Sequence, residues 1–126
     1  MFVLGIIIIL LFAIYQTNGT VYTETIYGEK GRSVKLPCYH NGTRPVDRVF
    51  FQDPHSDSGY YVYLEEQIIT HARDNKYRLD TSDFTVIITN ISLNDTGIYK
   101  CMSTNFIDFL SETFRSTLIL YGMYRL

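Results

Sequence analysis

A seven-residue stretch, Asp95-Thr96-Gly97-Ile98-Tyr99-Lys100-Cys101, constrains the fold of this 126-residue chain more than any other feature. It has the form Asp-x-Gly-x-Tyr-x-Cys, and the only other cysteine, Cys38, lies 63 positions earlier. Gly97 permits a tight turn because it has no Cβ. The stretch therefore predicts a strand at residues 98–103 that begins directly after a turn and carries the second cysteine of a distant pair.

This stretch resembles strand F of immunoglobulin sandwiches. In that fold a tyrosine two residues before the second cysteine hydrogen-bonds the chain upstream, and the cysteine crosses the core to strand B. The resemblance implies a disulfide between Cys38 and Cys101, with Cα atoms about 5.5–7 Å apart. It also implies a tyrosine corner in which Tyr99 bonds the backbone near Asp95. Such a fold makes recognition, rather than chemistry, the expected function.

The same resemblance implies that an arginine holds Asp95 at the base of the sandwich. Arg78 and Arg73 are the two candidates in the sequence. We prefer Arg78 because it lies in a predicted strand at residues 76–79.

The chain opens with an uncharged apolar run from Phe2 to Tyr15, followed by the polar residues 16–19. The run is shorter than the roughly 20 residues of a membrane-spanning helix. It predicts a signal peptide at residues 1–19 and a mature domain at residues 20–126, with an uncleaved anchor as the alternative. No second apolar run follows, so we expect a soluble, secreted product without a membrane span. Two cysteines in that compartment are typical of one disulfide and no free thiol.

Short alternating strands separated by turns every 8 to 12 residues predict an all-β, variable-type immunoglobulin sandwich. A Tyr-rich segment at residues 60–65, between the third strand and residues 76–79, marks the variable type. The chain has no tryptophan to pack on the disulfide. Phe51 is the expected replacement because it shares the inward parity of Val49. The other expected strands are residues 20–27, 33–38, 48–52, 84–89, 98–103 and 113–121.

The residue inventory argues against an enzyme, a cofactor and a metal site. The three histidines, His40, His55 and His71, fall in predicted loops without cysteines or paired carboxylates at ligand spacing. We predict no catalytic residue and no small-molecule substrate. The net charge is −2 without a basic cluster, which excludes nucleic acid as the expected partner.

Four short segments resemble the V domain of the B-seven family of costimulatory ligands on antigen-presenting cells, its second member in particular. They are residues 36–38, 49–53, 62–64 and 76–77. The resemblance implies a soluble ligand mimic or immunomodulator that engages a lymphocyte receptor. The chain also has 11 Tyr, many Ile and no Trp, a bias typical of an AT-rich genome, which favours a viral homologue.

An aromatic sheet face is the expected receptor-binding surface, because interfaces are enriched in Tyr, Phe and Met. The alternation predicts that one face carries Phe50, Gln52, Tyr61, Tyr63, Lys100 and Met102. The opposite parity, with Tyr60, Val62 and Leu64 on that face, remains open. A second hypothesis is a structural or assembly module that self-associates or packs on a companion subunit through the same face. The expected state is therefore a monomer or a weak homodimer.

Three N-glycosylation sequons lie in the predicted mature domain, at Asn41, Asn90 and Asn94. The expected strands place Asn41 and Asn94 in exposed loops. Asp95 follows Asn94 directly, so crowding is expected to lower the use of that site.

Overall fold

The computed structural model describes residues 19–39, 45–69, 76–105 and 110–121. Within them, nine strands form two β-sheets, and one short helix lies between the seventh and eighth strands. The strands are β1 Gly19–Gly28, β2 Val34–Pro37, β3 Arg48–Gln52, β4 Tyr60–Leu64, β5 Gln67–Ile68, β6 Tyr77–Asp80, β7 Thr85–Ile88, β8 Gly97–Asn105 and β9 Leu110–Leu120. The helix η1, a single 3₁₀ turn, spans Leu93–Asp95.

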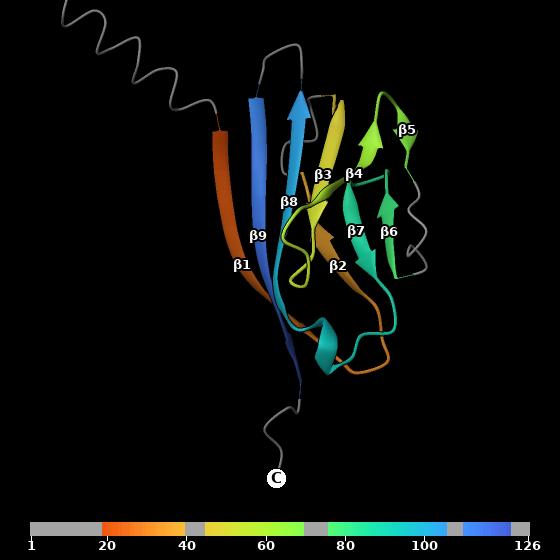
Figure 1. Ribbon diagram of the computed structural model, residues 1–126, viewed down its shortest axis with the longest axis vertical. Coiled ribbons are helices and arrows are strands. Elements are labelled where there is room, and N and C mark those ends of the chain that lie inside the picture. Colours follow the sequence, from red (N-terminus) through yellow and green to blue (C-terminus); the bar gives the residue numbers. More distant parts are fainter. Residues whose placement is uncertain (1–18, 40–44, 70–75, 106–109, 122–126) are drawn as a thin grey trace, which may run out of the picture.

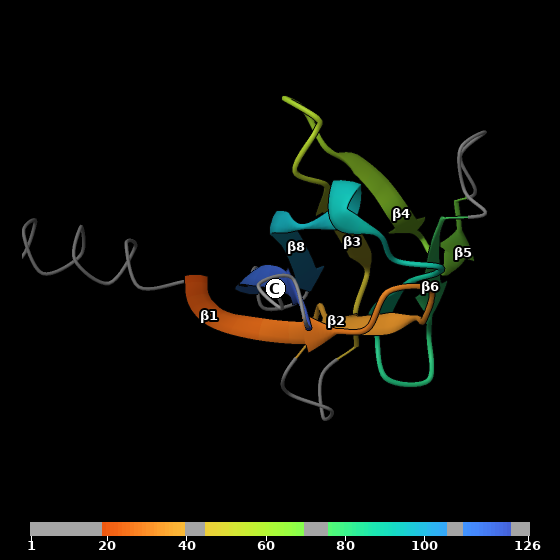
Figure 2. The same ribbon diagram turned by 90° about the horizontal axis from the view of Figure 1, so that it is seen from below.

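The larger sheet has six strands in the order β1-β9-β8-β3-β4-β5, and the smaller has three in the order β2-β7-β6. Figure 1 shows the larger sheet running from β1 to β4 with the smaller sheet against it. The view from below in Figure 2 separates the layers, with β2 on one side and β3 and β8 on the other. β1 pairs parallel with β9 along ten residues. The expected variable-type immunoglobulin sandwich is confirmed; β5 was not among the predicted strands.

The core lies between the sheets and follows the alternation of the strands. Val49 and Phe51 in β3 are fully buried, as are Val86 and Ile88 in β7. The expected disulfide between Cys38 and Cys101 is confirmed, with Cα atoms 5.2 Å apart, slightly closer than the sequence indicated. It joins the two layers where their inner faces meet.

Phe51 takes the central place that an immunoglobulin domain usually gives to tryptophan. It lies opposite Cys101 in the β3–β8 register and is 0% exposed. Its ring packs against Tyr60, Tyr77 and Tyr99, with centroids 5.0–6.0 Å away. Three neighbouring aromatic rings thus fill the space around a side chain smaller than the usual indole.

Phe51→Ala should lower the free energy of unfolding by about 3–5 kcal/mol, because it removes a buried ring and leaves a cavity. Urea denaturation measures this change. Phe50→Ala is the matched control, since the neighbouring ring is half-buried on the outer face. Equal losses from the two variants would contradict the inward parity of Phe51.

Candidate functional site

The outer face of the six-stranded sheet carries a line of apolar side chains across five strands. Strand partners in a sheet share a face, so the pairing register determines which side chains meet. It aligns Phe50 with Met102, and Phe50 with Tyr61 on the other side. The line continues through β9 and β1. This apolar row consists of Tyr61, Phe50, Met102, Thr113 and Val21.

Aromatic contacts hold the β3–β4 end of the apolar row in place. The Phe50 and Tyr61 rings meet edge to face with centroids 5.3 Å apart, and the Arg48 guanidinium lies 5.4 Å from the Tyr61 centroid. Gly59 allows Phe50 to lie flat against the loop, since a Cβ at Gly59 would come within 2.5 Å of the ring. Tyr61 is 37% exposed and Val21 61%, so both ends of the row remain open to a partner.

A basic row lies next to the apolar row on the same face. Gln52 aligns with Lys100, Lys100 with Arg115, and Arg115 with Thr23. Gln52 is held by a hydrogen bond from its Nε2 to the Ser56 carbonyl at 2.9 Å. We define the basic row as Gln52, Lys100, Arg115 and Thr23.

Five of the six residues predicted for the receptor-binding face lie together on it, namely Phe50, Gln52, Tyr61, Lys100 and Met102. The placement of Tyr63 was wrong. Its ring packs on Phe84 of the other layer with centroids 5.4 Å apart, and it is half-buried against the core. The cause is a register shift in the β3–β4 pairing between Val49 and Phe50. Val62 is the extra residue, and after it the side chains of β4 change face.

Sequence patterns did not indicate that Thr113, Arg115 and Val21 contribute to this face. Their outward parity could be anticipated within each strand, but their alignment with Lys100 and Met102 depends on how β9 and β1 dock. Arg48 was likewise missed, although it immediately precedes Val49 in a predicted strand.

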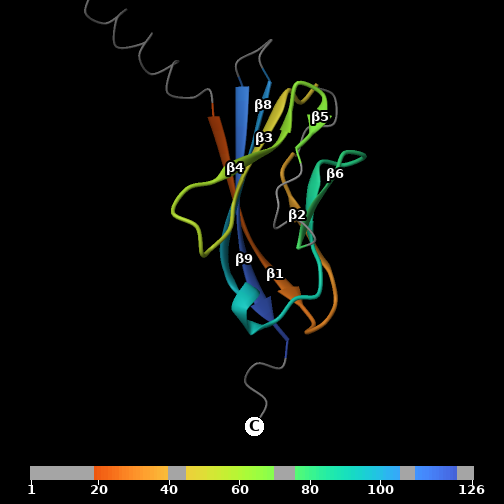
Figure 3. The same cartoon turned by 45° about the vertical axis from the view of Figure 1, so that its right-hand side comes forward.

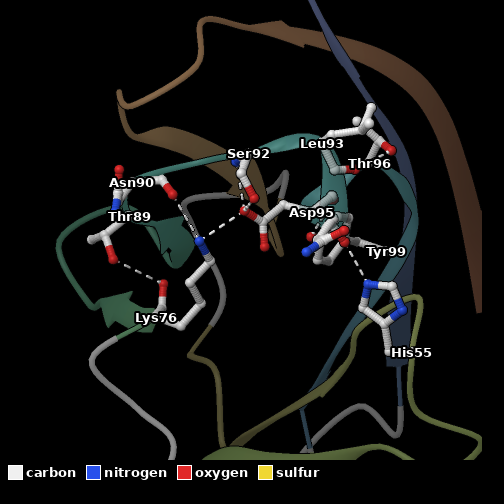
Figure 4. A network of polar contacts seen from close by, with 10 residues as sticks. His55, Lys76, Thr89, Asn90, Ser92, Leu93, Asp95, Thr96 and Tyr99 are labelled. Carbon is white, nitrogen blue, oxygen red and sulfur yellow. Dashed lines mark hydrogen bonds and ion pairs between the residues drawn. The ribbon is translucent and has the colours of Figure 1, made fainter.

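The base of the sandwich is organised around Asp95 (Figure 4). The Tyr99 hydroxyl donates to the Asp95 carbonyl at 2.6 Å, and Tyr99 is 1% exposed. Gly97 enters β8 with φ of +139°, which side chains with a Cβ rarely adopt. The Asp95 carboxylate accepts a hydrogen bond from the Ser92 N–H at 2.7 Å. These contacts join the turn before β8 to the core.

The preferred partner of Asp95, Arg78, was wrong. The Lys76 ammonium lies 2.7 Å from the carboxylate and also donates to the Asn90 carbonyl at 2.9 Å, as Figure 4 shows. Arg78 is exposed, and it aligns with Ile87 on the outer face of the three-stranded sheet. Lys76 precedes β6 and so escapes the alternation of that strand. Arg73, the other candidate, lies outside the described residues.

The remaining sequence candidates that the structure describes are Asn90, Asn94 and His55. Asn90 and Asn94 are exposed near η1, and their glycosylation stays a prediction; Asn41, His40 and His71 lie outside the described residues. His55 is exposed, and its Nε2 contacts the Asn94 carbonyl. Across residues 19–39, 45–69, 76–105 and 110–121, no three His, Cys, Asp or Glu lie close enough to hold a metal ion. The same part of the chain has no helix that could cross a membrane.

Lys76→Ala should lower the free energy of unfolding by about 1–3 kcal/mol, because the buried Asp95 carboxylate loses its cationic donor. Arg78→Ala, two residues along the chain, should leave stability nearly unchanged. Urea denaturation of both variants tests the assignment. The reverse order of effects would restore Arg78 as the partner.

A buried tyrosine, Tyr99, and a half-buried one, Tyr77, make the domain sensitive to alkali. Burial, followed by the Asp53 carboxylate, raises the pKa of Tyr77 to about 12, and burial raises the pKa of Tyr99 further above its ordinary value. An unfolded tyrosine ionises near pH ~10. Above that pH the unfolded chain releases protons that the folded chain retains, so stability falls as pH rises.

The urea midpoint should therefore stay flat up to about pH 9 and fall between about pH 10 and 12. Tyr99→Phe should cost about 1–3 kcal/mol at pH ~8, because the Asp95 carbonyl loses its donor, and should show a smaller alkaline loss. Unfolding curves from pH ~8 to ~12 measure both effects. A steeper alkaline loss in the variant would contradict the role of Tyr99.

Comparisons with known proteins agree with this architecture. A family model for the immunoglobulin V-set domain matches residues 22–119. The chain is 28% identical over 94 residues to the human cytotoxic and regulatory T-cell molecule, covering 72% of this chain and 22% of that protein's length.

Two solved structures share the fold. Tim-1 has a TM-score of 0.59 at 22% identity, and the match covers 79% of this chain and 91% of that one. The CD2-binding domain of CD58 (lymphocyte function-associated antigen 3) has a TM-score of 0.59 at 20% identity, covering 79% and 54%. At these identities the likeness is one of fold alone.

Proposed function

The chain belongs to the immunoglobulin V-set family, and on that premise we propose that it is an extracellular binding domain that engages a protein receptor on lymphocytes. The observation that carries the proposal is the apolar row on the outer face of the six-stranded sheet. Three of its five members, Tyr61, Phe50 and Met102, are of the residue types enriched at protein interfaces. Figure 3 shows the strands of this face lying side by side from β1 to β4.

The geometry of the face favours a macromolecular partner over a small ligand. The apolar row crosses five adjacent strands, which are about 4.8 Å apart in a sheet. It therefore offers an extended surface, whereas small-molecule sites are concave and enclosed. An aromatic anchor near the centre with polar neighbours is the arrangement that concentrates binding energy in a few residues.

The relatives support a lymphocyte setting. The cytotoxic and regulatory T-cell molecule is named for T cells, and the matched part of CD58 is its CD2-binding domain. We propose by analogy that this chain also binds a surface protein of these cells. The narrower form of the proposal is a soluble mimic of a costimulatory ligand, encoded by a virus and secreted after removal of residues 1–19.

Phe50→Ala and Tyr61→Ala should each weaken binding by about 2 kcal/mol or more, because they remove the aromatic anchors of the face. Flow cytometry with the purified, labelled domain on resting and activated blood lymphocytes measures the loss. Arg78→Ala is the control, since Arg78 is exposed on the other sheet. Ile87 is a poorer control because it is 9% exposed, so its truncation would disturb folding.

Tyr63→Ala separates packing from binding. Tyr63 contacts Phe84 of the other layer, so this variant should lose stability and keep its affinity while folded. If Arg78→Ala weakened binding and both face variants bound normally, the interface would lie on the other sheet. A stable self-assembled species at micromolar concentration in size-exclusion chromatography would instead favour the structural or assembly role.

A further inference from the structure

Two positive charges face each other at the middle of the binding face. Lys100 in β8 and Arg115 in β9 are direct cross-strand partners. Like charges in directly opposite positions destabilise a sheet. Arg115 is exposed and Lys100 is half-exposed, so water screens the repulsion without removing it. The folded domain gains nothing from placing these two side chains together.

Among the described residues, no carboxylate forms an ion pair with Lys100 or Arg115. The outward positions of β1, β9, β8 and β3 hold three cations, Arg48, Lys100 and Arg115, and no acidic residue. The acidic residues of these strands, Glu24 and Glu112, have the opposite parity, because they align with the buried Ser116 and Ser103.

Some other cations of the domain have carboxylate partners within it. Lys35 lies 3.6 Å from Asp80 and 3.5 Å from Asp83, and Arg32 lies 3.1 Å from Glu29. The whole chain has a net charge of −2. The positive charge of the outer face is therefore a local feature and does not reflect the composition.

Lys100 lies between the apolar side chains of Met102 and Ile98, and Arg115 lies between Thr113 and Thr117. The apolar row passes next to them through Met102 and Thr113. On the other side Ile98, two residues before Lys100, is 62% exposed. Directly opposed side chains have Cβ atoms about 4.5–5.5 Å apart, so Lys100 and Arg115 can both reach one carboxylate between them. A partner that places a carboxylate there would also cover apolar surface above and below it.

We infer that the receptor presents an Asp or Glu side chain, flanked by apolar residues, that docks between Lys100 and Arg115. This inference rests on the proposed function, because it concerns the same face. Bound in this way, the carboxylate removes the repulsion within the sheet, while the apolar row and Ile98 exclude water around it. Two copies of the face would bring four such cations together, so the same arrangement disfavours a face-to-face homodimer.

The test compares folding and binding in the same variants of the full chain. Lys100→Gln and Arg115→Gln should each raise the thermal midpoint or leave it unchanged, because they remove the opposed charges. Each should weaken binding to activated blood lymphocytes by roughly tenfold, and Arg115→Glu should weaken it further. Raising the ionic strength from about 0.05 to about 0.3 M should weaken the parent and affect Arg115→Gln less. Lys35→Gln, which removes an exposed cation from the other sheet, is the matched control and should bind as the parent does.

Each contrary result would overturn a different part of the proposal. Normal binding by both Gln variants, together with a loss in Tyr61→Ala, would overturn the acidic contact and leave the proposed function standing. Normal binding by all of these variants would overturn the face itself. Loss of parent binding after neuraminidase treatment of the cells would assign the carboxylate to sialic acid and overturn the protein contact. A lower thermal midpoint in Arg115→Gln would overturn the premise of repulsion.

Discussion

The packing of Phe51 against the Cys38–Cys101 disulfide determines how the rest of this domain is arranged. Phe51 and Cys101 are direct partners in β3 and β8, and both are buried. Because side chains alternate along a strand, their inward direction turns Phe50 and Met102 outward. The proposed binding face is therefore a consequence of the core. A change in the core that rotated β3 would also dismantle the face on the other side of the sheet.

The two faces of the six-stranded sheet differ in packing, exposure and charge. The inner face is largely apolar where it packs against the second sheet, and it also buries Ser103 and Ser116. The outer face combines an exposed apolar row with two opposed cations, an arrangement that does not help the isolated domain to fold. Exposed aromatic side chains and unrelieved charges are features that a partner can satisfy. Lys35 and Lys76, by contrast, are paired with carboxylates within the domain, and this difference supports the proposal that the outer face is a recognition surface.

Several contacts show which side-chain directions the alternation along the sequence predicts correctly and which it does not. The alternation in residues 48–52 was sufficient to direct Phe51 inward and Phe50 outward, because both lie in one regular strand. The same reasoning was wrong for Tyr63, since the irregular β3–β4 pairing changes the parity of β4 after Val62. Arg78 was preferred as the partner of Asp95 because it lies in a strand, yet the strand itself directs Arg78 to solvent. Lys76 reaches Asp95 because it lies in the bend before β6, where alternation no longer applies.

The amino-acid sequence by itself determined the fold class, the disulfide, the inward direction of Phe51 and the outward direction of Phe50, Gln52, Lys100 and Met102, and it left the parity of Tyr61 open. These features depend on short-range alternation and on a spaced pair of cysteines, both of which can be read along the chain. Only the tertiary structure decided that Lys100 lies opposite Arg115, that Thr113 and Val21 extend the apolar row, and that Tyr63 belongs to the core side. Those facts depend on the register between strands, and register is set by loop geometry, bulges and the docking of whole strands.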